Sequence, residues 1–306
     1  GLKGNPTNNV VNFRSTNDLS NKNSATINST GQFVALGDQG YNSVTKQFTD
    51  LSVSSSASWN YRGIVVPVSE HEIHATRYSS TSMYSSPSIQ RFNATTGALL
   101  GTASLSTSGC TSQVSSYWYD AAVDPNGNIW TVSYSYYYLT KWTLNTAKTQ
   151  WQCSTYYNYG YPYYLTGVDF DDDTGRMYVS YYDQSSYPTY NRYLMEVNPS
   201  NPRSINSTWS IGSAADYNYK TTSTAGNPNS GLVVDLPRVI LNEYNVQGSR
   251  HHHFSMNGFA LDKMGVQEMP NGGHYGITQF DDEGKIYYSC YHTSYCNSVS
   301  RKIHMY

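Results

Sequence analysis

One pattern recurs along most of this chain: a short apolar strand, an acidic or glycine-containing turn, and a second strand rich in aromatic residues. The clearest copies are Ala121–Ser135, Gly167–Tyr181 and Ile277–Tyr291. Weaker copies are Ser24–Gly37, Gly63–Tyr78 and Gly231–Tyr244. A repeat of this kind indicates a fold that is built from similar supersecondary units.

The turns of the repeat carry glycines at one equivalent place: Gly31, Gly127, Gly175 and Gly284. Glycine adopts positive φ without steric cost, which a tight hairpin turn requires. Each copy therefore predicts a β-hairpin.

Most copies are followed by a second strand–turn–strand segment, seen in Ile89–Leu100, Leu139–Trp151, Leu194–Trp209 and Phe254–Met269. Windows with the 3.6-residue spacing of amphipathic helices do not occur. The units recur every 40 to 60 residues or so, and each has the four antiparallel strands of a propeller blade. The sequence therefore predicts an all-β chain folded as a β-propeller.

The two ends of the chain indicate six blades in a single domain covering residues 1–306. Val299–Tyr306 adds a third strand after the last hairpin, whereas Val10–Phe13 is a strand with no local partner. Pairing these two segments would complete the sixth blade and cover two exposed sheet edges. The predicted blades are approximately 24–58, 61–106, 118–153, 164–211, 230–269, and 274–306 together with 9–14.

In this repeat pattern the chain resembles six-bladed propellers of the NHL-repeat and gluconolactonase-like kind, across nearly its whole length. The resemblance lies in the architecture and brings no functional signature with it. It implies a channel mouth at one end of the ring, where the innermost strands of the blades begin.

Composition narrows the classes of partner. Charged residues make up only 13% of the chain, the formal net charge is −2, and there are 31 tyrosines. Nucleic-acid binding needs clustered Lys and Arg, which are missing here. No apolar stretch is long enough to span a bilayer.

The cysteines and sequons favour a secreted or cell-surface protein. Cys290 and Cys296 flank a short hairpin and are predicted to pair, and Cys110 and Cys153 are a second candidate pair, with buried free thiols as the alternative. Glycosylation sequons occur at Asn28, Asn93 and Asn206, although a chain so rich in Asn, Ser and Thr produces some by chance.

Polar residues at the starts of the innermost strands are candidates for a ligand site at the channel mouth. They are Arg62, Tyr119, Asp120, Thr166, His274 and Tyr275. Such a group suits a small polar ligand or a cation, but every propeller has a mouth of this sort and most hold only water.

Three other groups are assigned structural roles. His251–His253 is predicted to be a polar loop, because adjacent strand side chains point to opposite faces and cannot meet at one metal. His71 and His74 are predicted to be solvated strand residues. The runs Asp171–Asp173 and Asp281–Glu283 are assigned to turns, with Ca²⁺ binding as the less favoured alternative. We therefore expect no metal site and no cofactor.

The tyrosines include a dense group that is predicted to lie in a long connection around Gly160 and Pro162. Its members are Tyr156, Tyr157, Tyr159, Tyr161, Tyr163 and Tyr164. So many rings exceed what inter-blade packing can bury, and exposed aromatic patches usually mark a contact surface.

These features favour a non-catalytic extracellular propeller, structural or adhesive, that associates with itself, with other extracellular proteins or with glycans through a Tyr- and Ser-rich surface. The alternative is a metal-dependent hydrolase or lactonase that works at the channel mouth, where a cation would activate water or polarise a carbonyl. Asp120 is almost the only acidic residue available there, which weakens that alternative. An intracellular interaction scaffold is the least favoured class.

Overall fold

The computed structural model describes residues 25–27, 33–36, 39–42, 47–50, 65–69, 71–78, 87–93, 96, 98–115, 118–133, 137–171, 173–186, 190–212, 231–245, 248–268, 275–280, 286–290 and 304–305. The chain divides into two compact units, and each is described by itself. Unit 1 comprises residues 1–106, 144–152 and 273–306, and unit 2 comprises residues 107–143 and 153–272.

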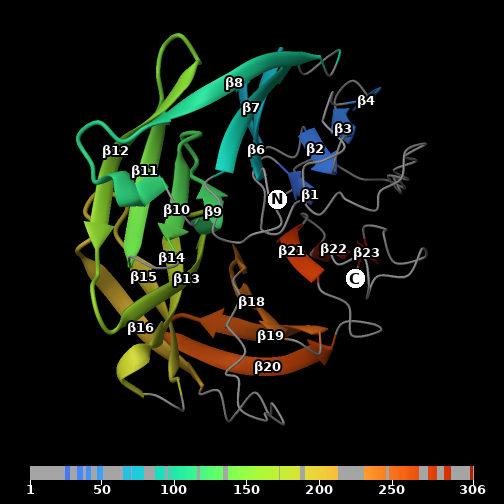
Figure 1. Cartoon of the computed structure of the whole chain (residues 1–306). Coiled ribbons are helices and arrows are strands. Elements are labelled where there is room, and N and C mark those ends of the chain that lie inside the picture. Colours follow the sequence, from blue (N-terminus) through green and yellow to red (C-terminus); the bar gives the residue numbers. More distant parts are fainter. Residues whose placement is uncertain are drawn as a thin grey trace. The chain divides into compact units, whose positions relative to one another are not determined.

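Unit 1 consists of antiparallel sheets whose strands follow one another along the chain (Figure 1). The first sheet contains β1 (Ala25–Ile27), β2 (Phe33–Leu36), β3 (Gln39–Asn42) and β4 (Gln47–Asp50). The second run contains β5 (Val65–Ser69), β6 (Glu72–Tyr78), β7 (Pro87–Asn93) and β8 (Leu99–Ser106). The last sheet contains β21 (Tyr275–Phe280), β22 (Ile286–Cys290) and β23 (His304–Met305).

Two contacts join distant segments within unit 1. Strand β1 lies against β21, so the first described strand of the chain neighbours the last sheet. Residues Gln150–Gln152 pair in parallel with Ser104–Ser106 at the edge of β8. The sequence did not predict this second pairing, which adds a fifth strand segment to that run.

Unit 2 repeats the same antiparallel arrangement. Its first run contains β9 (Trp118–Val123), β10 (Ile129–Ser133), β11 (Tyr138–Leu144) and β12 (Gln150–Asn158), of which residues 144–152 belong to unit 1. The second contains β13 (Tyr163–Phe170), β14 (Met177–Asp183), β15 (Arg192–Val197) and β16 (Ile205–Gly212). The third contains β17 (Leu232–Asp235), β18 (Arg238–Asn245), β19 (Gly248–Asn257) and β20 (Ala260–Glu268).

The described residues contain no α-helix, only two short 3₁₀ turns, η2 (Ser112–Ser115) and η3 (Gln184–Ser186). Nothing among them has the helical length and apolar character that a membrane span requires. The prediction of an all-β chain is confirmed for the described residues, and three of the sheets have four antiparallel strands. The other two sheets differ from it, because the parallel pairing of β8 with β12 produces an eight-stranded sheet and β21–β23 form a three-stranded one. The predicted closing strand Val10–Phe13 lies outside the described residues, so six blades and a closed ring remain predictions.

The two turn glycines that the structure describes have the predicted conformation. Gly127 and Gly175 have φ of 78° and 67°, in the left-handed region. At the first turn the Asp124 carboxylate accepts hydrogen bonds from the backbone amides of Asn126 and Asn128, both at 2.9 Å. Gly31 and Gly284 lie outside the described residues.

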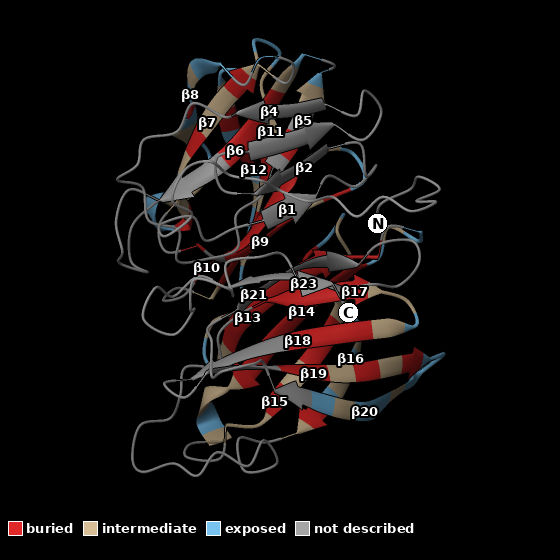
Figure 2. Ribbon diagram, turned by 90° about the vertical axis from the view of Figure 1, so that its right-hand side faces the viewer, coloured by how far each residue is buried: buried red, intermediate tan, exposed pale blue. Residues whose placement is uncertain are grey.

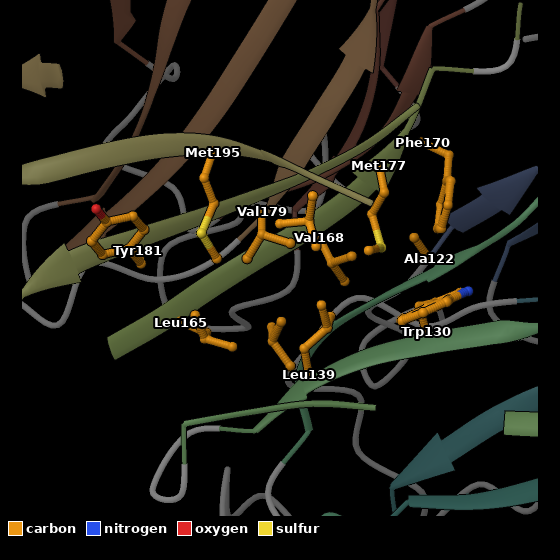
Figure 3. Close-up of a cluster of buried hydrophobic side chains, with 12 residues drawn as sticks. Ala122, Trp130, Leu139, Leu165, Val168, Phe170, Met177, Val179, Tyr181 and Met195 are labelled. Carbon is orange, nitrogen blue, oxygen red and sulfur yellow. The ribbon is translucent and has the colours of Figure 1, made fainter. Parts of the chain in front are cut away.

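The core of unit 2 forms where the inner strands of successive sheets face each other. Trp130, Leu139 and Ala122 contact a set from the next sheet that includes Val168 and Met177 (Figure 3). Buried residues follow the inner strands, and exposed ones gather at turns and along outer strands such as β8 and β20 (Figure 2). In unit 2, consecutive residues of inner strands such as β10, β13 and β17 are buried, so both faces of these strands are covered.

Gly167 in β13 is predicted to be sensitive to any added side chain. A Cβ atom there would lie 2.7 Å from Ser180 Oγ and 2.8 Å from Leu232 Cβ, which is closer than real Cβ contacts. We expect Gly167→Ala to lower the free energy of unfolding by about 1–3 kcal/mol, because β17 has to move away. Urea denaturation measures this loss.

The matched control is Gly265→Ala in the edge strand β20, where a Cβ meets no atom within 4 Å. Equal effects of the two substitutions would contradict the close approach of β13 and β17.

Candidate functional site

Asp120, the acidic candidate for a channel-mouth site, is buried and committed to backbone hydrogen bonds. Its Oδ2 atom accepts from the amide of Val168 at 3.0 Å and from the amide of Leu232 at 3.3 Å. Its Oδ1 atom accepts from the amide of Ala121 at 3.0 Å. One carboxylate therefore connects β9, β13 and β17, the inner strands of three successive sheets.

Two further aspartates continue the same arrangement along β17. Asp169 Oδ2 accepts from the amide of Val234 at 2.9 Å, and Asp171 Oδ1 accepts from the amide of Leu236 at 3.0 Å. Leu232 and Val234 alternate along β17, so their amides face the same side, and Leu236 follows directly after the strand. We call Asp120, Asp169 and Asp171 the carboxylate row.

Of the remaining channel-mouth candidates, the structure describes the side chain of Thr166 alone, so a ligand site at the channel mouth remains a prediction. Thr166 is buried, and its hydroxyl is 2.9 Å from the Ser180 hydroxyl. Only the backbone of Tyr119 and Tyr275 is described, at the start of β9 and β21. Arg62 and His274 lie outside the described residues.

The prediction of a polar loop at His251–His253 is wrong. All three residues lie inside β19, and His251 and His252 are fully buried. Burial, together with His253 and His252, lowers the pKa of His251 to about 3. In a strand, His251 and His253 share one face. The polar residues on either side of the histidines led to the prediction of a loop at the surface.

His74 is also buried, although the sequence predicts a solvated residue. The Trp151 indole donates to His74 Nδ1 at 3.0 Å, and the other ring nitrogen is 2.9 Å from Glu72 Oε1. The Arg91 Nε atom donates to the same Glu72 oxygen at 2.6 Å. Burial lowers the pKa of His74, so the ring is neutral and donates to Glu72.

One signal in the sequence marks this network. Glu72 and His74 are two residues apart in a strand and therefore share a face. His71, by contrast, is exposed in the turn before β6. Burial would raise the pKa of Glu72, but the hydrogen bonds from Arg91 and His74 outweigh it and lower the pKa.

The aspartate run Asp171–Asp173 contributes to a turn and to the carboxylate row. Asp171 accepts hydrogen bonds from the backbone and the hydroxyl of Thr174, while Asp173 is exposed. Asp281–Glu283 lies outside the described residues. Within the described part of the chain, no group of three metal-ligating side chains is found.

The tyrosine group is predicted to lie in a long connection, but the connection covers only residues 159–162, between β12 in one sheet and β13 in another. We call residues 156–164 the tyrosine segment. Strand β12 extends to Asn158, β13 begins at Tyr163, and Gly160 has φ of 69° between them. Tyr156 and Tyr161 keep 42% and 66% of their surface exposed. Tyr164 is buried, and Tyr157, Tyr159 and Tyr163 are half-buried.

Two continuous series of ring contacts include members of the tyrosine segment. One runs Tyr157–Tyr159–Tyr163–Tyr181–Tyr193, with centroids 4.7 to 5.9 Å apart. The other runs Tyr137–Tyr164–Tyr182–Tyr190, with centroids 4.4 to 6.1 Å apart. Burial raises the pKa of Tyr159 and Tyr181, so their phenols stay protonated.

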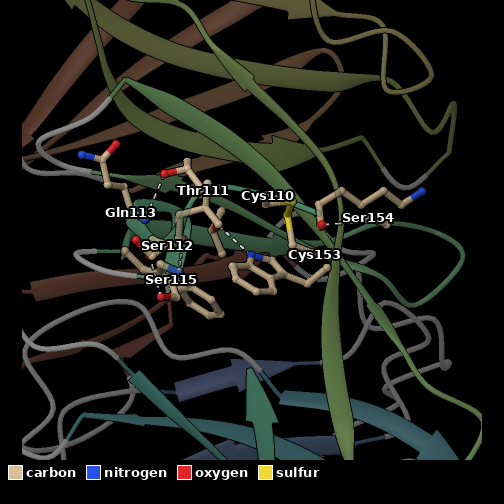
Figure 4. The surroundings of a disulfide bond; sticks show 12 residues. Cys110, Thr111, Ser112, Gln113, Ser115, Cys153 and Ser154 are labelled. Atoms are coloured by element: carbon tan, nitrogen blue, oxygen red, sulfur yellow. Dashed lines mark hydrogen bonds between the residues drawn. A yellow bond between two sulfur atoms is a disulfide. The ribbon is translucent and has the colours of Figure 1, made fainter. Parts of the chain in front are cut away.

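A disulfide joins Cys110 and Cys153 in unit 2 (Figure 4). It ties the loop that carries η2 to strand β12. Cys290 is described only as backbone at the end of β22, and Cys296 lies outside the described residues, so their pairing remains a prediction.

Two of the three sequons fall among the described residues. Asn206 is exposed in the outer strand β16, and its Nδ2 atom donates to Glu196 Oε1 at 3.0 Å. Asn93 ends β7, and its Oδ1 atom accepts from the amide of Thr96 at 2.8 Å. Asn28 lies outside the described residues, and occupancy of all three remains a prediction.

Comparisons with known proteins find likeness in fold. No protein-family model matches the chain, and no curated protein matches it in sequence. Hydrazine synthase from Kuenenia stuttgartiensis is similar over 97% of this chain and 98% of its own, with a TM-score of 0.51 and 9% identity. A luciferin-regenerating enzyme is similar over 94% and 90% of the two chains, with a TM-score of 0.50 and 13% identity.

The Dos1 propeller is also similar, over 94% of this chain and 71% of its own, with a TM-score of 0.45 and 8% identity. The successive antiparallel sheets of both units have the strand order that propeller blades have. In fold, the chain resembles β-propellers. At these identities the likeness concerns fold alone and carries no activity over to this chain.

The buried His251 predicts a loss of stability in acid. Its pKa is about 3 in the folded protein and 6.5 in the unfolded chain, so the unfolded state binds more protons below pH 6.5. Stability is complete above pH 6.5 and falls as the pH drops towards 3. We expect urea denaturation to show about 2 kcal/mol less stability at pH 5 than at pH 7.5 from this group.

The variant His251→Gln should show a shallower dependence on pH over the same range, whatever its stability at pH 7.5. An unchanged slope would show that His251 is not the group responsible.

Proposed function

We propose that this protein is a non-catalytic extracellular binding module, a six-bladed propeller closed between Val10–Phe13 and Val299–Tyr306. Its contact surface is the tyrosine segment, which binds glycans or a second copy of the chain. The observation that carries this proposal is the exposure of the Tyr156 and Tyr161 rings in that segment.

The surface around these rings has the chemistry of a contact for uncharged partners. Ser154, Tyr156 and Asn158 are all exposed and alternate along β12, so they share one face. None of them carries a charge. An aromatic ring flanked by hydroxyl and amide groups offers both an apolar surface and hydrogen bonds.

The packing of the tyrosine segment supports a recognition role. The Tyr159 hydroxyl donates to the Pro202 carbonyl at 2.6 Å, and the Arg203 guanidinium lies 5.7 Å from the centre of the Tyr157 ring. The segment is therefore held by its half-buried rings, and less conformational entropy is lost when its exposed rings meet a partner.

An extracellular location agrees with the Cys110–Cys153 disulfide, because such bonds persist in oxidising compartments. The alternative of a metal-dependent hydrolase gains no support from Asp120, whose two oxygens accept three backbone hydrogen bonds. A carboxylate used in this way is poorly placed to hold a cation at a channel mouth.

The double variant Tyr156→Ala/Tyr161→Ala tests the surface. We expect the wild-type protein to be retained on neutral glycans or to self-associate, and the double variant to bind about tenfold more weakly or worse, as loss of an aromatic contact residue does. A glycan array and light scattering over a range of concentrations measure the two modes.

Phe259→Ala is the control, because Phe259 is 91% exposed on a different turn. A wild-type protein that stays a monomer at high concentration and is retained on no glycan would contradict the proposal.

A further inference from the structure

We infer that Gln113, Tyr138 and Tyr156 form a binding subsite for one ring of an uncharged saccharide, and that the Cys110–Cys153 disulfide assembles it. This inference rests on the proposed function. It adds the class of ligand, a residue outside the tyrosine segment, and a dependence of binding on the redox state.

The three side chains come from separate segments of unit 2 and meet at one place. The Tyr138 hydroxyl donates to Gln113 Oε1 at 3.2 Å. The Tyr138 ring packs against the Tyr156 ring, with centroids 5.8 Å apart and planes inclined by 54°. Tyr138 itself is buried, while Tyr156 and Gln113 are exposed.

This arrangement presents an aromatic surface beside an oriented amide. Since Gln113 Oε1 accepts from the Tyr138 hydroxyl, the Nε2 group of the same amide is directed elsewhere and can donate. A saccharide ring has an apolar C–H face and hydroxyl groups at its edge. The Tyr156 ring can stack on the C–H face, and the Gln113 amide can donate a hydrogen bond to a hydroxyl group.

The size and the charge of the subsite favour a sugar over a protein partner or an anion. One half-exposed ring and one amide cover far less than the area of about 1,000 Å² that a specific protein–protein interface requires. None of the three side chains is charged, whereas recognition of phosphate or carboxylate relies on Arg or Lys. A neutral saccharide is the class that remains.

The disulfide positions both halves of the subsite. Gln113 lies three residues after Cys110 in the η2 loop, and Tyr156 lies three residues after Cys153 in β12 (Figure 4). The loop has a second anchor, since the Trp118 indole donates to the Val114 carbonyl at 3.1 Å. Reduction of the disulfide would remove the covalent link between the loop that carries Gln113 and the strand that carries Tyr156.

The test uses the full chain and a panel of neutral oligosaccharides: gluco-, xylo-, manno- and galacto-oligomers. Isothermal titration gives the Kd for each member that the array retains. We expect Gln113→Glu, which keeps the acceptor for Tyr138 but loses the Nε2 donor, to raise Kd about tenfold. Tyr156→Phe should stay within about twofold of wild type, because the ring remains.

Asn257→Asp is the matched control outside the proposed contact surface. It makes the same nitrogen-to-oxygen change on an exposed amide at the end of β19. We expect its Kd to be unchanged. Cys110→Ser/Cys153→Ser should weaken binding by at least as much as Gln113→Glu, with circular dichroism reporting whether that variant is folded.

Separate results overturn the inference and the proposed function. If Tyr156→Ala/Tyr161→Ala loses binding while Gln113→Glu binds as tightly as wild type, the tyrosine segment is the contact surface but the subsite is wrong. Self-association without retention of any panel member also overturns the subsite alone. A protein that neither binds the panel nor self-associates overturns both. A disulfide variant that fails to fold leaves the decision to Gln113→Glu.

Discussion

The hydrogen bonds from strand amides to the carboxylate row hold the inner strands of unit 2 together. Strand β17 is an edge strand of its own sheet, and the amides of Leu232 and Val234 donate to the carboxylates of Asp120 and Asp169 in neighbouring sheets. Buried amides that lack an acceptor cost about 1–3 kcal/mol each. Asp120 and Asp169 supply these acceptors. Separate sheets are thereby joined without merging into one.

This mode of joining sets requirements on the neighbouring residues. A side-chain carboxylate reaches the next strand only if the two backbones approach closely, and Gly167 permits that approach. The strand that carries it has a bulge at Thr166, where the register shifts between Leu165 and Gly167. Bulges change the direction of a strand and of its side chains. Apolar side chains of β10, β13 and β14, such as Trp130, Val168 and Met177, belong to one buried core.

The same arrangement limits where the protein can bind a partner. In unit 2, polar residues that could have formed a site at the inner strands instead hydrogen-bond to backbone or to each other, as Asp120 and Thr166 do. The exposed aromatic rings of Tyr156 and Tyr161 lie instead in the tyrosine segment. The supporting tyrosines are buried or half-buried, whereas Tyr156 and Tyr161 remain exposed.

Sequence periodicity predicted the strands well, because hairpin turns and two-residue alternation are local signals. The turn at Gly127 and the strands on either side of it follow directly from such signals. Burial of polar residues could not be predicted in the same way. His74 and His251 are internal because residues distant in sequence cover them, Trp151 in the case of His74. Asp120 was correctly placed on an inner strand, but its amide partners lie 48 and 112 residues further along the chain.

Amide hydrogen exchange at Val234 tests the carboxylate row most directly. This amide donates to Asp169 Oδ2 at 2.9 Å, so it should exchange as slowly as the sheet amides beside it. In Asp169→Ala its exchange should accelerate by at least about tenfold, while the amide of Val168, which donates to Asp120, stays protected. Exchange of the Val234 amide at the rate of an unstructured peptide in the wild-type protein would contradict the account.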